Sequence, residues 1–137
     1  MGGKIILIGG GGHCVSIIDV IEKESKYEIF GVIDPNKEIG EKILGYQILG
    51  GDDLITEFLK DDFLFCLAVG LIKSSSLKRK LASTLPIDRC PNIISPLAYI
   101  SRHTKIGFGN HIMHNVVINA DAKIGNFNIL NTKSNVE

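Results

Sequence analysis

A six-residue repeat of aliphatic side chains runs through the last third of the chain and restricts the folds open to it. The repeating positions are Ile100, Ile106, Ile112, Ile118, Ile124, Leu130 and Val136. Neither an α-helix, with a period of about 3.6 residues, nor a β-strand, with a period of about 2, requires an unbroken series at six. A parallel β-helix does, because each flat side uses about one hexapeptide and three sides make a coil of about 18 residues. We expect three stacked columns: Ile100 with Ile118 and Val136, Ile106 with Ile124, and Ile112 with Leu130.

The first hundred residues follow a different pattern, in which apolar runs alternate with segments of helical periodicity. The expected strands are residues 4–8, 27–33 and 63–69, and the expected helices are residues 13–24, 52–60 and 74–83. Strands and helices that alternate at this spacing predict a parallel sheet covered on both faces. Pro91 and Pro96 indicate a connection between units rather than a central strand. We therefore predict a Rossmann-like α/β domain over residues 1–95, and the first coils of a left-handed parallel β-helix over residues 96–137.

A glycine run lies where the first predicted strand meets the first predicted helix. Gly9, Gly10, Gly11 and Gly12 precede His13, and glycines at such a junction let backbone N–H groups approach a phosphate at the positive end of a helix. Asp34 ends the second strand, where a carboxylate can accept hydrogen bonds from a ribose or a base. The alternatives are a tight turn without a ligand for the glycines and a half-buried packing residue for His13.

The glycine run meets the dinucleotide fingerprint G-x-G-x-x-G only in part. The register from Gly9 ends in Cys14 and the register from Gly10 ends in Val15, where the fingerprint has glycine. The departure counts against NAD and an NAD-dependent oxidoreductase. His13 stands near a positive helix end, and we expect its pKa to be lowered for that reason.

Composition excludes several other classes of protein. Fifteen Lys and Arg balance fifteen Asp and Glu, which removes the electrostatic footprint of a nucleic-acid binder. The sequence has three cysteines and no C-x-x-C pair, so we expect no disulfide framework and a reducing, cytoplasmic location. No apolar run approaches the ~20 residues of a membrane span. His103, His111 and His114 have no cysteine or carboxylate clustered with them, so we expect no metal site.

Four motifs together resemble the sialic acid O-acetyltransferase family, which includes bacterial acetyltransferases of UDP-4-amino sugars. They are Ile8-Gly9-Gly10-Gly11-Gly12-His13-Cys14, Val32-Ile33-Asp34, Leu67-Ala68-Val69-Gly70 and the hexapeptides. The resemblance implies an acetyl-CoA-dependent acetyltransferase acting on a nucleotide-linked amino sugar or on sialic acid. It also implies a homotrimer for the full-length protein. The nucleotide expected from the resemblance is a uridine or cytidine sugar nucleotide.

The same resemblance implies which residues contact the substrate. They are Gly9, Gly10, Gly11, Gly12, His13, Asp34, Gly70 and Asn131. Asn131 has an alternative role as a corner residue of the β-helix, because asparagine tolerates a left-handed backbone. The family has an Asn soon after the glycine that corresponds to Gly70, and this chain lacks it; Ser74–Ser76 are expected to cap the following helix.

The segment from Ile129 to Glu137 resembles the stretch that leads directly into the family's catalytic histidine. By that resemblance the histidine follows Glu137, so we expect this chain to be an incomplete form that contains no catalytic residue and is inactive. The alternative is a non-catalytic module that binds a nucleotide or a nucleotide sugar.

Overall fold

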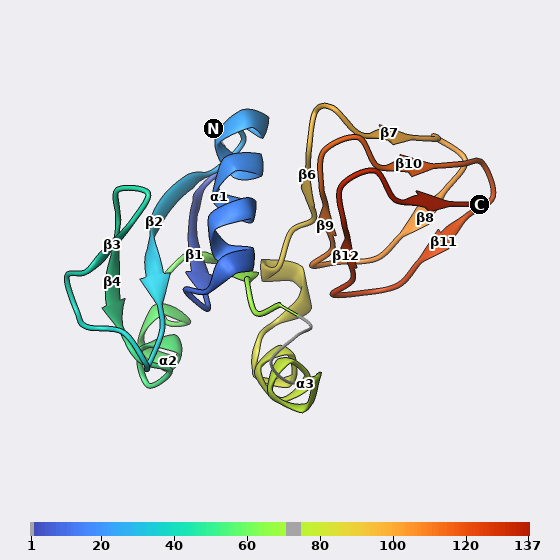
Figure 1. Cartoon of the computed structure of the whole chain (residues 1–137). Helices are drawn as coiled ribbons and strands as arrows, with labels where there is room; N and C mark the ends of the chain where they lie inside the picture. The colour runs from blue at the N-terminus through green and yellow to red at the C-terminus, as the bar shows by residue number, and fades with distance from the viewer. Residues whose placement is uncertain (1, 71–74) are drawn as a thin grey trace.

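A computed structural model describes residues 2–70 and 75–137, which form an α/β unit followed by a β-helix (Figure 1). The elements of the α/β unit are β1 (Lys4–Ile8), α1 (Gly12–Glu24), β2 (Glu28–Ile33), β3 (Lys42–Ile43), β4 (Tyr46–Gly50), α2 (Leu54–Phe58), β5 (Leu64–Leu67), α3 (Ser75–Thr84) and the 3₁₀ turn η1 (Ile87–Arg89). Its sheet has the order β3-β4-β2-β1-β5. All pairs are parallel except β3 with β4. The predicted Rossmann-like α/β fold is confirmed.

Side chains of β1 alternate between two buried faces of this sheet. Ile5 and Leu7 belong to the core that contains α1, whereas Ile6 and Ile8 belong to a second core that contains apolar residues of α2 and α3. A strand covered by helices on both faces has no polar positions to alternate with its apolar ones. The continuous apolar run of residues 4–8 is explained by this double burial.

The β-helix follows the predicted six-residue register. Its strands are β6 (Ile93–Ile94), β7 (Tyr99–Ile100), β8 (Lys105–Ile106), β9 (His111–Ile112), β10 (Val117–Ile118), β11 (Lys123–Ile124), β12 (Ile129–Leu130) and β13 (Asn135–Val136). The three parallel sheets stack the expected columns, Ile100 with Ile118 and Val136, Ile106 with Ile124, and Ile112 with Leu130. The start of a left-handed parallel β-helix is therefore confirmed.

The repeat begins one hexapeptide earlier than the sequence predicted. Ile94 of β6 pairs with Ile112 of β9, so the segment between Pro91 and Pro96 forms a side of the first coil. In this sheet β6 is an edge strand, a position where flanking prolines remove no ladder hydrogen bond.

The sequence analysis also missed the β3–β4 hairpin and overestimated the length of α2. Leu44 and Gly45 connect β3 to β4 with φ of 48° and 91°. A two-residue turn with both φ values positive is normally indicated by Asn-Gly or Asp-Gly in the sequence. Here Gly45 matches that pattern and Leu44 does not. The helix expected over 52–60 spans Leu54–Phe58. The helix expected over 74–83 is described from Ser75, and the cap predicted at Ser74–Ser76 begins outside the described residues.

Helix α1 lies between the sheet and the β-helix (Figure 1) and belongs to one hydrophobic core with both. This core joins residues of the sheet to Ile93, Met113 and Val116 of the first coils. Polar contacts accompany the apolar ones. The Ile94 N–H donates to Glu24 Oε2 at 3.3 Å, and His114 Nε2 lies 2.9 Å from Asp19 Oδ2. The α/β unit and the coils are thus packed as one body.

Two findings bear on the expectations from composition. Cys14, Cys66 and Cys90 are free thiols, all of them buried. Among the described residues, the helices are too short or too polar for any of them to cross a bilayer.

Asparagines stack on one another at one corner of the β-helix, at intervals of one coil. Asn92 Oδ1 accepts hydrogen bonds from the backbone N–H of Asn110 at 2.8 Å and from its Nδ2 at 3.1 Å. Asn110 Nδ2 donates to the Gly125 carbonyl at 2.7 Å, and Asn110 Oδ1 accepts from the Asn128 N–H at 2.9 Å. Asn110 itself is fully buried, and its hydrogen bonds in this ladder are partly buried.

We expect Asn110→Ala to destabilise the chain strongly, because it leaves the Gly125 carbonyl and the Asn128 N–H without their partner. Each lost hydrogen bond costs about 0.5–1.5 kcal/mol, and the substitution removes the side-chain bonds to Asn92, Gly125 and Asn128. The free energy of unfolding from urea denaturation measures the loss. Asn135→Ala is the matched control, since Asn135 is exposed, and it should change the free energy of unfolding by less than about 0.5 kcal/mol. Equal effects of the two substitutions would contradict a structural role for the ladder.

Candidate functional site

A pocket of about 600 Å³ opens where β1, β2 and β5 end. Strand β1 lies between β2 and β5, and α1 leaves it on one face of the sheet while α2 and α3 cover the other. Ligands of doubly wound sheets bind at such a switch point, beyond the carboxyl ends of the strands. All eight residues that the sequence analysis singled out line this pocket: Gly9, Gly10, Gly11, Gly12, His13, Asp34, Gly70 and Asn131.

The first two glycines of the loop are required by the backbone. Gly9 has φ of +106°, and a Cβ there would lie 3.0 Å from Val69 Cγ2. A Cβ on Gly10 would lie 2.9 Å from Ile43 Cδ1 and 3.1 Å from Asp34 Oδ2. The positive φ of Gly9 therefore disfavours any other residue there, and a side chain at Gly10 would have to displace the ends of the Ile43 and Asp34 side chains.

The next two glycines face open space. A Cβ on Gly11 or Gly12 would meet nothing within 4 Å. Within the part of the chain that the structure describes, the backbone N–H groups of Gly11, Gly12 and His13 also donate to no acceptor. Three unpaired N–H groups at the start of the 13-residue helix α1 make a site of positive potential that suits an anion.

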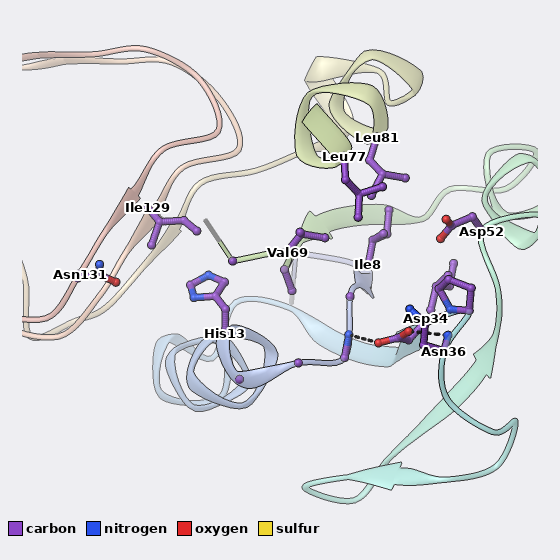
Figure 2. A pocket seen from close by; sticks show the side chains of 18 residues that line it. Ile8, His13, Asp34, Asn36, Asp52, Val69, Leu77, Leu81, Ile129 and Asn131 are labelled. Atoms are coloured by element: carbon purple, nitrogen blue, oxygen red, sulfur yellow. Dashed lines mark hydrogen bonds between the residues drawn. The ribbon is translucent and has the colours of Figure 1, made fainter. Parts of the chain in front are cut away.

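The Asp34 carboxylate shapes the loop. Its Oδ2 accepts the Gly10 N–H at 3.0 Å, and its Oδ1 accepts the Asn36 N–H at 2.8 Å (Figure 2). The sequence analysis expected this carboxylate to meet a ribose or a base, and its place in the pocket leaves that contact possible through the remaining lone pairs. In the free protein its role is to hold the glycine loop against the end of β2.

His13 is joined to a histidine of the β-helix. Its Nε2 lies 2.9 Å from His111 Nδ1, and His111 Nε2 lies 3.4 Å from the sulfur of Cys66. Burial lowers the pKa of His13 to about 4, with a further contribution from the charge of Lys78. Burial likewise lowers the pKa of His111 to about 3. The direction expected for His13 is correct, but desolvation and Lys78, rather than the helix end, are the main causes.

His111, Cys66 and Lys78 are the residues near the pocket that sequence reasoning missed. His111 is 2% exposed and Lys78 is 8% exposed. In the hexapeptide pattern the residue before each aliphatic points outward from the coil, which normally means toward water. On β9 this outward direction leads into the core shared with α1 and β5, and no feature of the sequence reveals that packing.

The β-helix contributes a wall of the pocket through β12. Ile129 and Asn131 lie on the side of the pocket where His13 is found, and Asp34, Asn36 and Asp52 lie on the opposite side (Figure 2). Asn131 is exposed, and its carbonyl accepts the Ser134 N–H at 3.0 Å in a corner of the coil. Asn131 therefore occupies a corner and lines the pocket at the same time.

The described residues contain no group of three or more His, Cys, Asp or Glu that could hold a metal ion. His114, one of the histidines considered for such a site, instead contacts Ser95 Oγ at 2.6 Å through Nδ1 and Asp19 through Nε2.

The buried neutral imidazoles predict that stability falls as the pH drops below about 6.5, the ordinary pKa of histidine. Above this pH both the folded and the unfolded chain hold neutral histidines. Below it, and down to the folded pKa of about 3 for His111, only the unfolded chain takes up the proton, so the free energy of unfolding decreases.

For His111 alone the expected decrease between pH 7 and pH 5 is about 2 kcal/mol, at about 1.4 kcal/mol per pH unit below 6.5. Urea denaturation at pH 7, 6 and 5 measures it, with His111→Phe as the comparison that removes this titration. Parallel pH profiles of the native chain and the variant would contradict the burial of a neutral His111.

Comparison with known proteins connects this pocket to a family. A family model described as the PglD N-terminal domain matches residues 4–85. A protein of Acanthamoeba polyphaga mimivirus is 35% identical over 126 residues, which are 92% of this chain and 24% of that protein. This chain thus spans about a quarter of that relative.

Solved structures match nearly the whole chain. A variant of perosamine N-acetyltransferase from Caulobacter crescentus, in complex with CoA and GDP-perosamine, has a TM-score of 0.86 at 28% identity. The match covers 98% of this chain and 62% of the enzyme. The acetyltransferase domain of PglB from Neisseria gonorrhoeae, in complex with acetyl coenzyme A, has a TM-score of 0.83 at 24% identity, over 97% of this chain and 63% of the domain. The second likeness concerns the fold alone.

The family match and the fold agree on the same region of the chain. Residues 4–85 contain every strand of the α/β sheet together with the glycine loop and Asp34. Because these residues make up more than half of the sequence, the chain belongs to the PglD N-terminal domain family.

Proposed function

We propose that this chain provides the sugar-nucleotide site of an acetyl-CoA-dependent acetyltransferase that acts on an amino group of a nucleotide-linked sugar. The observation that carries the proposal is the pocket with three N–H groups at the start of α1 that have no acceptor among the described residues. The likeness to an N-acetyltransferase solved with CoA and GDP-perosamine supports it. Sialic acid, the other acceptor implied by the sequence resemblance, remains a candidate.

The diphosphate of the nucleotide sugar would lie over Gly11 and Gly12. Their N–H groups and that of His13 would donate to its oxygens, and the helix end would stabilise its charge. The nucleoside would extend toward Asp34, Asn36 and Asp52, and the sugar toward His13 and Asn131 (Figure 2). Guanosine is a candidate nucleoside in addition to uridine and cytidine, since the relative of known structure binds GDP-perosamine.

Acetyl transfer requires chemistry beyond binding. The sugar amine attacks the thioester carbonyl, a C–N bond forms, the C–S bond breaks, and the proton lost by the amine reaches the departing thiolate through a general base. Among the described residues that line the pocket, the side chains able to accept a proton are His13, Asp34 and Asp52. His13 Nε2 and the Asp34 oxygens already have partners.

We propose that the base and the acetyl-CoA cleft belong to the part of the solved enzyme that this chain does not match, and that the full-length protein is a homotrimer. Three free buried cysteines support a reducing, cytoplasmic location. A non-catalytic nucleotide-binding module would use the same pocket, and acetyl transfer distinguishes the two functions.

Gly12→Ala is expected to weaken nucleotide binding without harming the fold. The added Cβ would point into open space in the free protein and would occupy the place of a phosphate oxygen. Loss of a charge-assisted hydrogen bond costs about 1.5–3 kcal/mol, so the dissociation constant for GDP or UDP, measured by calorimetry, should rise about tenfold or more. Alanine also has a higher helix propensity than glycine, so the melting temperature of the variant should be unchanged or higher.

Gly125→Ala is the matched control, because a Cβ there would meet only Asn128 Nδ2 at 3.9 Å and Gly125 does not line the pocket. Affinity for GDP and UDP should be unchanged in this variant. Tighter binding of NAD than of GDP, UDP or CMP by the native chain would overturn the sugar-nucleotide assignment.

We expect the 137-residue chain to release no thiol from acetyl-CoA above background when it is mixed with GDP-perosamine or a UDP-4-amino sugar. The perosamine N-acetyltransferase from Caulobacter crescentus serves as the positive control with GDP-perosamine. Turnover comparable to that of the control would show that these residues contain the general base.

A further inference from the structure

Three side chains from separate parts of the chain form a hydrogen-bonded series that ends at the pocket. Cys66 of β5 contacts His111 of β9, and His111 contacts His13 of α1, at 3.4 and 2.9 Å. Cys66 and His111 are 1% and 2% exposed, and His13 is partly exposed at the pocket. The two imidazole planes differ by only 14°. A distance of 2.9 Å between ring nitrogens is too short for stacked ring faces, so the nitrogens point at each other in a shared plane.

The protons in this series can be counted. Both imidazoles are neutral at pH 7, because burial and the charge of Lys78 lower their pKa values to about 4 and about 3. A neutral imidazole carries one N–H donor and one acceptor nitrogen. Only one proton can therefore lie between His13 Nε2 and His111 Nδ1. The nitrogen to which this proton is bonded determines the tautomer of both rings.

The contact with Cys66 indicates whether His13 or His111 carries the proton that lies between the two rings. Burial raises the pKa of its thiol well above the ordinary value, so the sulfur keeps its proton. His111 Nε2 is the sulfur's only hydrogen-bond contact in the part of the chain that the structure describes. A thiol is a weak donor and a weak acceptor, but its S–H group has no other acceptor among the described residues, whereas the His111 N–H can donate to the stronger acceptor His13 Nε2. Donation of the S–H group to His111 Nε2 is therefore the arrangement in which every donor of Cys66 and of His111 has an acceptor. The His111 proton then lies on Nδ1 and is donated to His13 Nε2.

The consequence reaches the pocket through the other nitrogen of His13. With Nε2 acting as an acceptor, the proton of neutral His13 lies on Nδ1. Nδ1 has no hydrogen-bond partner among the described residues. The imidazole lines the pocket (Figure 2) close to Gly70, where an added Cβ would lie 3.6 Å from His13 Cβ. An N–H group at this place complements the phosphate and hydroxyl oxygens of a nucleotide sugar, whereas a bare nitrogen would repel them.

We propose that Cys66 and His111 are positioning residues that hold His13 in its Nδ1–H tautomer, so that His13 serves as a neutral hydrogen-bond donor to a phosphate or sugar oxygen of the ligand. The ligand in this statement rests on the proposed function. The tautomer itself does not, because it is set in the free protein.

The first test is ¹⁵N NMR of the histidine-labelled 137-residue chain at pH 7 without ligand, with His13→Gln and His111→Phe used to assign the signals. Two-bond ¹H–¹⁵N spectra identify which ring nitrogen carries the proton. We expect Nδ1–H for both His13 and His111. A proton on Nε2 of His13 would overturn the proposal, and the tautomer itself is read in the native chain.

The second test separates orientation from simple packing. His111→Phe keeps a ring and removes the donor, whereas His111→Asn loses the ring but places an amide N–H where Nδ1 stood. We expect the dissociation constant for GDP to rise about tenfold in the Phe variant and less than about threefold in the Asn variant, as one charge-assisted hydrogen bond predicts. Equal losses in both variants would contradict a positioning role.

Cys66 allows a third comparison within the same spectra. Cys66→Ser keeps a donor and should preserve the His13 tautomer, and Cys66→Ala removes the donor and should yield a mixture of tautomers. An unchanged spectrum in the Ala variant would show that the thiol does not determine the tautomers of His111 and His13. If the native chain has the expected tautomer but binds neither GDP nor UDP, the result contradicts the proposed function and supports the assignment of the His13 tautomer.

Discussion

Burial of α1 on two sides is the constraint on which the rest of the structure depends. Cys14, Ile17, Ile18, Val20 and Ile21 are all inaccessible to solvent, which is too wide an apolar surface for a helix that covers a single sheet. The sheet covers one side, and the first coils of the β-helix cover another through Ile93, Met113 and Val116. Apolar residues of the coils lie in the same hydrophobic cluster as those of α1, so α1 also completes the core of the coils.

Several polar groups enclosed by this packing form hydrogen bonds between the α/β unit and the coils, and these bonds contribute to the site. The carboxylate of Glu24 accepts the Ile94 N–H, and burial raises its pKa. His111 meets His13 and Cys66 in the same core. Because each such contact joins the α/β unit to the coils, the wall formed by Ile129 and Asn131 is held at a defined place opposite the glycine loop.

Much of the fold could be predicted from the sequence because both units have strong periodic patterns. The aliphatic series gave the stacking register of the coils, and strand ends followed by glycine or aspartate indicated where the pocket lies. The hairpin of β3 and β4 was missed because its turn uses Leu44, a residue that rarely adopts positive φ. His111 was missed for a different reason: whether an outward-facing residue meets water or another unit depends on tertiary packing that one sequence does not encode locally.

The shared core has a consequence for how such chains are exchanged between proteins. Nucleotide-binding units and β-helices look like separate modules, yet a recombination point between α3 and β9 would separate His111 from both His13 and Cys66. A foreign coil would place some other side chain against the buried thiol and leave an imidazole beside an unmatched neighbour, at about 1–3 kcal/mol for each orphaned polar group. We therefore expect replacement of the first two coils alone to lower stability, and replacement further along a solenoid, where each coil contacts only its neighbours, to cost less.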